Sequence, residues 1–109
     1  MNESRLIYEI MQILGKHAKV FRCQAGSPVL ADGITRYNGL PKGFSDILAI
    51  LPNGRAAFIE VKSGNAKATP EQERFLAQMR DTGALAGIAR SISEAFAICN
   101  LEDDIEDYL

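Results

Sequence analysis

The 109-residue chain contains no tryptophan, one histidine and two cysteines, and it has no long apolar run. Its longest apolar stretches, such as residues 47–51, are far shorter than the roughly 18 residues that span a bilayer. The first ten residues lack the basic and then apolar order of a secretion signal. Cys23 and Cys99 form no CxxC pair and cannot make a four-ligand zinc site. These absences predict a cytoplasmic protein that does not enter a membrane, with two reduced cysteines in its core.

Hydrophobic residues make up 47% of the chain and charged residues 24%, which is typical of one folded globular domain. The net charge is −2, but five of the 14 acidic residues lie in residues 101–109. The first 100 residues hold 12 lysines and arginines against nine acidic residues. The sequence therefore predicts a mildly basic domain over residues 1–100, followed by an acidic tail over 101–109 that is solvated or forms a last helical turn.

The spacing of apolar residues predicts an α/β fold with the element order αβββαβα. Helices are expected at 4–16, 70–81 and 91–99, and strands at 19–24, 46–51, 55–62 and 85–90. Asn2 or Ser4 caps the first helix, and Thr69 followed by Pro70 begins the second. The second and third strands are apolar on both faces, so helices should cover both sides of the sheet.

The turn between the second and third strands decides which side chains meet. A two-residue turn at Asn53 and Gly54 would leave Asp46 without a carboxylate opposite. A three-residue loop that includes Pro52, with Gly54 in the left-handed conformation, suits the backbone of each residue better and pairs Asp46 with Glu60. We favour this register, in which the two carboxylates share one face with their Cβ atoms about 5 Å apart.

Glu60 and Lys62 are one residue apart on a strand, so both side chains emerge on the same face. Alone, this pair has a simple interpretation as an ion pair at a sheet edge. With Asp46 opposite, the two carboxylates repel each other unless a cation or proton lies between them. Oxygen ligands that leave positions for water and phosphate suit Mg²⁺ or Mn²⁺, which can polarise a phosphodiester. Lys62 would stabilise charge on the phosphate and help to orient or deprotonate the attacking water, so the predicted chemistry is hydrolysis.

Two polar residues point inward on the predicted helices. Glu3 lies near the centre of the apolar stripe of the first helix, whereas Glu9 lies at its edge. Gln72 points in the same direction as the apolar stripe of helix 70–81. Each also has a structural explanation, because Glu3 suits the positive end of a helix dipole and Gln72 suits a capping box with Thr69.

Three motifs in this order, Gly43–Asp46 (GFSD), Ile59–Lys62 (IEVK) and Thr69–Gln72 (TPEQ), resemble the PD-(D/E)xK nuclease superfamily. In particular, they resemble its VRR-NUC family, over about residues 3–90. The resemblance implies a restriction endonuclease-like core, in which a mixed β-sheet is flanked by helices. Ser45 stands where the superfamily motif has its proline, a change that replaces no ligand.

The resemblance also implies the active-site residues. The metal-dependent centre would consist of Asp46, Glu60 and Lys62. The first-helix glutamate near the metal would be Glu3, with Glu9 as the alternative. Gln72 would be the glutamine that follows the ExK strand. The implied ligands of the Mg²⁺ or Mn²⁺ ion are Asp46, Glu60, Glu3 and the backbone carbonyl of Val61.

The function implied is that of an endodeoxyribonuclease that hydrolyses DNA phosphodiester bonds, selective for branched, flapped or four-way-junction DNA in replication, recombination or repair. The location implied is a bacterial cell or a phage-infected host cell. Because so small a domain has little surface with which to grip two duplex arms, we expect a homodimer with two active sites. The alternative is a catalytically inactive nucleic-acid-binding or assembly module with the same fold. A nucleotide hydrolase finds no support, since the chain has no Walker-type loop.

DNA binding should come mainly from cations that contact phosphates, because the carboxylates themselves repel DNA. Arg36, Lys42 and Lys67 lie in loops that lead into or out of the active strands, and we expect these three nearest the cut site. Residues 16–22 hold a second basic run that ends at Arg22. No segment resembles a helix that reads bases, so sequence-specific cutting is not predicted.

Overall fold

The computed structural model describes residues 2–24, 32–33 and 39–104. Within these ranges the secondary-structure elements follow the predicted order, with boundaries within two residues of those expected. They are α1 (Glu3–Leu14), β1 (Lys19–Arg22), β2 (Ile47–Ile50), β3 (Ala56–Val61), α2 (Pro70–Asp81), β4 (Leu85–Ala89) and α3 (Ile92–Ile98).

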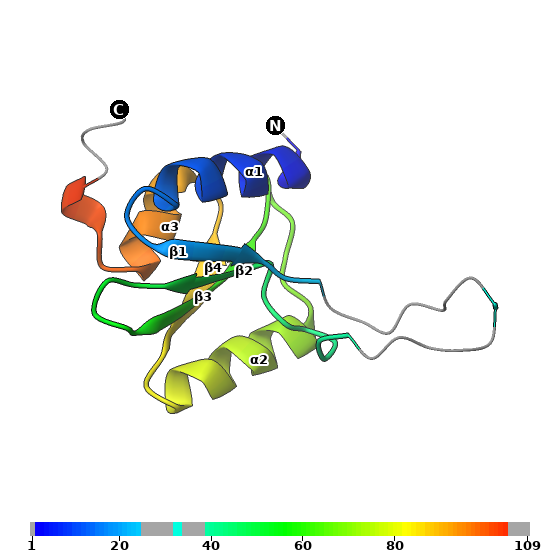
Figure 1. Ribbon diagram of the computed structural model, residues 1–109. Helices are drawn as coiled ribbons and strands as arrows, with labels where there is room; N and C mark the ends of the chain where they lie inside the picture. Colours follow the sequence, from blue (N-terminus) through cyan, green and yellow to red (C-terminus); the bar gives the residue numbers. More distant parts are fainter. Residues whose placement is uncertain (1, 25–31, 34–38, 105–109) are drawn as a thin grey trace.

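The four strands form one mixed sheet in the order β1-β2-β3-β4. The first three strands pair antiparallel, and β3 pairs parallel with β4 after the crossover through α2. Helices α1 and α3 cover one face of the sheet and α2 covers the other, so the molecule has three layers (Figure 1). The prediction of an α/β fold with a sheet covered on both faces is confirmed.

The β2–β3 hairpin has the predicted three-residue loop. The backbone N–H of Leu51 donates to the carbonyl of Arg55 at 2.9 Å, and Gly54 has a φ of 85°, in the left-handed region. Ile47 is the Cα partner of Ile59 in this register. The residues that precede and follow this pair, Asp46 and Glu60, therefore lie at the same end of the two strands.

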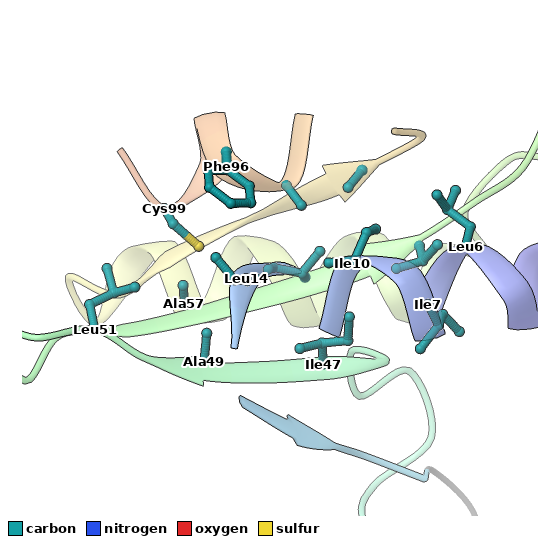
Figure 2. Packing of buried hydrophobic residues seen from close by; sticks show 14 residues of the cluster. Leu6, Ile7, Ile10, Leu14, Ile47, Ala49, Leu51, Ala57, Phe96 and Cys99 are labelled. Carbon is teal, nitrogen blue, oxygen red and sulfur yellow. The ribbon is translucent and has the colours of Figure 1, made fainter. Parts of the chain in front are cut away.

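The main core lies between the sheet and the α1–α3 layer. Asn2 caps α1, because its side-chain oxygen accepts the backbone N–H of Arg5 at 2.8 Å. Figure 2 shows the apolar stripe of α1 gathered with side chains from α3 and the strands. The residues labelled there are Leu6, Ile7, Ile10, Leu14, Ile47, Ala49, Leu51, Ala57, Phe96 and Cys99. Burial of this stripe fixes α1 against the sheet.

Helix α2 holds the loop that leads into β2. The rings of Phe44, Phe58 and Phe75 pack together, with centroids 4.5–5.9 Å apart. Gly43 has a φ of 92°, and a Cβ atom there would meet the carbonyl oxygen of Glu71 at 2.6 Å. Only glycine fits this contact, so the GFSD loop is held directly against the first turn of α2.

Cys23 and Cys99 are buried free thiols, as the sequence predicts. Beyond α3, Leu101 packs against the core and residues 102–104 form one turn of 3₁₀ helix. The rest of the predicted acidic tail, residues 105–109, lies outside the described residues. In the part of the chain that the structure describes, no helix is long and apolar enough to cross a membrane.

Candidate active site

Asp46 and Glu60 meet at one end of the β2–β3 hairpin, as the favoured register predicts. Asp46 immediately precedes β2, and its Oδ2 atom accepts the backbone N–H of Val61 at 2.8 Å. That bond ties the Asp46 carboxylate to the strand position next to Glu60. The two acidic side chains come from neighbouring strands and share one site.

Glu60 is a carboxylate held almost entirely away from water, with 1% of its surface exposed. Its Oε2 atom lies 3.3 Å from the ammonium nitrogen of Lys62. Its Oε1 atom is buried and has no hydrogen-bond partner among the described residues. Burial, followed by the negative charge of Asp46, raises the pKa of Glu60 to about 7, and the ammonium group of Lys62 offsets part of this rise. A buried oxygen without a partner is costly, so this atom is suited to a ligand.

Lys62 is the cation that contacts Glu60 in this site. Only 8% of its surface is exposed, although lysine is seldom buried. Its backbone N–H donates to the carbonyl of Ala89 at 3.1 Å, which extends the β3–β4 pairing by one residue. This hydrogen bond fixes the backbone of Lys62 on the sheet, and its side chain extends from there to Glu60.

Arg22 supplies a second cation, which the sequence analysis assigned only to a separate basic run. Its Nη1 atom lies 3.6 Å from Asp46 Oδ1 and donates to the Asp46 backbone carbonyl at 3.0 Å. The same atom donates to the carbonyl of Cys23. Since β1 pairs antiparallel with β2 and Arg22 stands opposite Ile47, its place beside Asp46 follows from that register. The sequence alone could place Arg22 beside Asp46 only if the register of β1 against β2 were already known.

The geometry fits a hard divalent cation. Two carboxylates lie together at the same end of β2 and β3, and one of their oxygens is buried with no partner among the described residues. Oxygen ligands of this kind suit Mg²⁺ or Mn²⁺. Among the described residues, no three His, Cys, Asp or Glu side chains gather closely enough to hold a metal ion. The acidic part of the site is therefore the pair Asp46 and Glu60, which leaves the remaining positions for backbone, water and phosphate oxygens.

Glu3 does not complete a set of three with that pair in this structure. It is half-buried in the first turn of α1. Its alternative, Glu9, is paired with Arg5 at 3.2 Å and lines a cavity of about 410 Å³ together with Ser63 and Arg90. The role predicted for a first-helix glutamate stays a prediction for Glu3.

Gln72 forms the capping box that its spacing from Thr69 suggested. Its Oε1 atom accepts the backbone N–H of Thr69 at 2.9 Å, and its own backbone N–H donates to the Thr69 hydroxyl at 3.2 Å. These bonds fix the side chain at the start of α2. A role in catalysis for this residue would come in addition to the cap.

The predicted DNA contacts are only partly covered by the structure. Lys42 is exposed, and its ammonium nitrogen lies 4.0 Å from Glu71, a distance at which an exposed pair adds little stability. Lys67 is exposed in the segment between β3 and α2. Arg36 lies outside the described residues. Both described lysines are open to solvent and to a phosphate group.

A mixed four-stranded sheet with helices on both faces, carrying Asp46 and a Glu-x-Lys strand at one end, defines a restriction endonuclease-like α/β protein. The family model described as the VRR-NUC domain matches residues 3–92, so the chain belongs to the VRR-NUC family. A solved structure titled "VRR_NUC domain" is 23% identical, with a TM-score of 0.61. That match covers 97% of this chain and 95% of the other, and it shows the shared fold. A search of the curated proteins found no match. Membership in the family implies a nuclease-type function.

Proposed function

We propose that the protein is an endonuclease that hydrolyses DNA phosphodiester bonds with the help of Mg²⁺ or Mn²⁺. The observation that carries this proposal is the buried Glu60 oxygen, which has no hydrogen-bond partner in the described part of the chain and lies in a site with Asp46 and Lys62. An acidic pair with one fully buried member gains from a divalent cation that balances both charges.

Asp46 and Glu60 would hold the metal, together with the backbone carbonyl of Val61. Glu3, in the first turn of α1, would be the further ligand. A bound divalent cation supplies Lewis-acid polarisation of the phosphodiester and lowers the pKa of a coordinated water. The protein's part is to keep the two acids together and shielded from solvent, as the Val61 hydrogen bond and the burial of Glu60 support.

Lys62 would neutralise charge on the scissile phosphate and orient the attacking water. Its ammonium group contacts Glu60 Oε2 at 3.3 Å and carries three N–H donors, so it can keep that contact and donate to a phosphate oxygen. Gln72 would position the same water through its amide N–H₂ group, because its oxygen is already used by the helix cap.

The substrate we propose is branched, flapped or four-way-junction DNA, encountered in replication, recombination or repair in the cytoplasm. Arg36, Lys42 and Lys67 would contact phosphates around the cut. A homodimer would present two active sites to two duplex arms.

Cleavage of plasmid, linear duplex, flapped and four-way-junction DNA in Mg²⁺, Mn²⁺ or chelator tests the proposal. We expect metal-dependent cutting that falls on the order of 10³-fold in Asp46→Asn, Glu60→Gln and Lys62→Gln. Asp81→Asn, a change of an exposed acid at the end of α2 distant from the site, is the matched control and should keep the wild-type rate.

Titration calorimetry with Mn²⁺ separates the roles of these residues. Asp46→Asn and Glu60→Gln should lose metal binding, whereas Lys62→Gln should keep it. If the wild type binds DNA but cuts none in any of these metals, the proposed enzyme is wrong and the alternative, a nucleic-acid-binding or assembly module, takes its place.

A further inference from the structure

We propose that Arg22 contacts the scissile phosphate and is a catalytic residue of this site, acting together with Lys62. The inference rests on the proposed nuclease function. It assigns a role to an arginine that the three sequence motifs do not include.

The first support is how firmly the guanidinium is held beside the site. Nη1 of Arg22 donates to the backbone carbonyls of Asp46 and Cys23 and lies 3.6 Å from Asp46 Oδ1. The N–H of Cys23 also donates to the Asp46 carbonyl, at 2.8 Å, so the β1–β2 ladder continues to this point. An arginine anchored to main chain on both strands is pre-positioned, and little side-chain freedom remains to be lost when it binds a ligand.

The second support is the donors left over. All the contacts of Arg22 within the described part of the chain use Nη1, and 43% of its side chain is exposed. Nε and Nη2 carry the remaining N–H groups of a planar fork that matches two oxygens of a phosphate. A guanidinium that is held through one nitrogen, and whose other nitrogens make no hydrogen bond to the described residues, is suited to donate to a ligand that arrives from solvent.

The third support is the charge balance of the site. Arg22 contacts Asp46 and Lys62 contacts Glu60, so each acid has one cation and the four side chains are neutral together when both acids are ionised. A bound divalent cation leaves a net positive charge of two. That charge would match the total charge of minus two that a phosphodiester carries once hydroxide attacks it. Without Arg22, half of this compensation is lost.

A purely structural role for Arg22 makes a different prediction from the proposed one. If the guanidinium served only to hold Asp46 in place, its removal would weaken metal binding. If it contacts the phosphate, its removal leaves the metal ligands intact and takes away a cation that repels the metal. The cleavage rate should then fall, whereas the affinity for Mn²⁺ should not.

The test compares Arg22→Gln and Arg22→Lys with Arg55→Gln. Arg55 is the matched control, because its guanidinium also donates to a main-chain carbonyl, that of Gly83 at 3.1 Å, but at the hairpin end of the sheet. Under single-turnover conditions with four-way-junction DNA and Mn²⁺, Arg22→Gln should cut on the order of 10²-fold slower. Arg22→Lys should recover only part of the rate, because an ammonium group cannot form the two-oxygen contact. Arg55→Gln should keep the wild-type rate.

Two further readouts decide between the roles. Mn²⁺ affinity by calorimetry should be unchanged or tighter in Arg22→Gln. The phosphate at the cut position mapped for the wild type is then replaced by an uncharged methylphosphonate. If Arg22 contacts that phosphate, the wild type and Arg22→Gln should bind this modified DNA equally well. Weakened Mn²⁺ binding, an unchanged cleavage rate, or a binding difference that survives the methylphosphonate would each overturn the inference. A wild type that cuts no DNA would remove the proposed function itself, whereas a cutting wild type with an equally active Arg22→Gln removes only this inference.

Discussion

Glu60 concentrates the chemistry of the site in one side chain. It is a strand residue with apolar neighbours on both sides in sequence, and the fold buries it to 1% exposure beside a second acid. Lys62 satisfies one oxygen and the other has no partner in the described chain. The metal-free site therefore favours a proton on Glu60, and a divalent cation would take the place of that proton.

The metal-free protein should lose stability as the pH rises through the range in which Glu60 titrates. The pKa of Glu60 is about 7 in the fold, against 4.5 for an ordinary glutamate. Between these two values the folded chain binds a proton that the unfolded chain has released, so the free energy of unfolding falls as the pH increases. Urea unfolding in chelator, from pH 5 to pH 8, measures this slope.

Glu60→Gln should remove most of that slope and be more stable than the wild type at the upper end of the range. Asp81→Asn should leave the slope as it is. Saturating Mn²⁺ should stabilise the wild type at high pH but not Glu60→Gln. A wild type whose metal-free stability rises between pH 5 and pH 7 would contradict this account of Glu60.

At the scale of elements, the site depends on α2 as well as on the strands. The loop that carries Asp46 passes directly over the first turn of α2 at Gly43 and packs Phe44 against Phe75. Ser45, in the position of the family's proline, is buried and donates its hydroxyl to the carbonyl of Ile47 at 3.1 Å. Asp46 is thus placed by contacts made before the strand begins.

Gly43→Ala should destabilise the protein by about 2 kcal/mol or more, because its Cβ atom would press on the Glu71 backbone at a positive φ. Gly54→Ala is the matched control, since Gly54 also has a positive φ but open space around it. It should cost only the backbone strain, about 1 kcal/mol. Thermal unfolding of both variants gives the comparison, and equal losses would show that the close approach at Gly43 is unimportant.

Gln72 can be separated into its two roles by a single substitution. Glutamate at the same position also completes a capping box, so Gln72→Glu should unfold at nearly the wild-type temperature. It lacks the N–H₂ group proposed to orient water and adds a negative charge near the phosphate. We therefore expect slower cleavage with unchanged stability; wild-type cleavage rates in Gln72→Glu would leave the residue as a helix cap alone.

At the scale of the whole molecule, the site occupies one end of the sheet, and the turn of the β2–β3 hairpin lies at the other end. Basic residues outnumber acidic ones over the first 100 positions, which favours binding to a polyanion, and the acidic excess lies near the C-terminus. In the proposed function, each chain would supply one cutting site, formed around Asp46 and Glu60. Symmetric cutting of two strands would then require two copies, as the proposed homodimer supplies.

The homodimer proposal predicts a sedimenting species of twice the 11.9 kDa of one chain when the protein is alone. If the dimer forms only on DNA, the complex should contain two chains for each four-way junction. Analytical ultracentrifugation with and without the DNA measures this. A monomer under both conditions would end the dimer proposal without affecting the site within each chain.

Much of this architecture could be predicted from local sequence signals. The stripe from Leu6 to Leu14, the cap at Thr69 and the turn at Gly54 each depend on residues close together in the chain. The same turn sets the β2–β3 register, and with it the meeting of Asp46 and Glu60. Helical periodicity, capping and turn geometry act over a few residues, and so they can be recognised without a structure.

The amino-acid sequence by itself determined the order of elements, the hairpin register and the pairing of the two acids, because these follow from short-range backbone preferences. Only the tertiary structure decided that one Glu60 oxygen is buried with no partner among residues 2–24, 32–33 and 39–104, and that Arg22 reaches Asp46. Arg22 and Asp46 are 24 residues apart and meet through the pairing of an edge strand, β1, with β2. Burial and contacts of that range depend on how whole elements pack, and no local pattern specifies them.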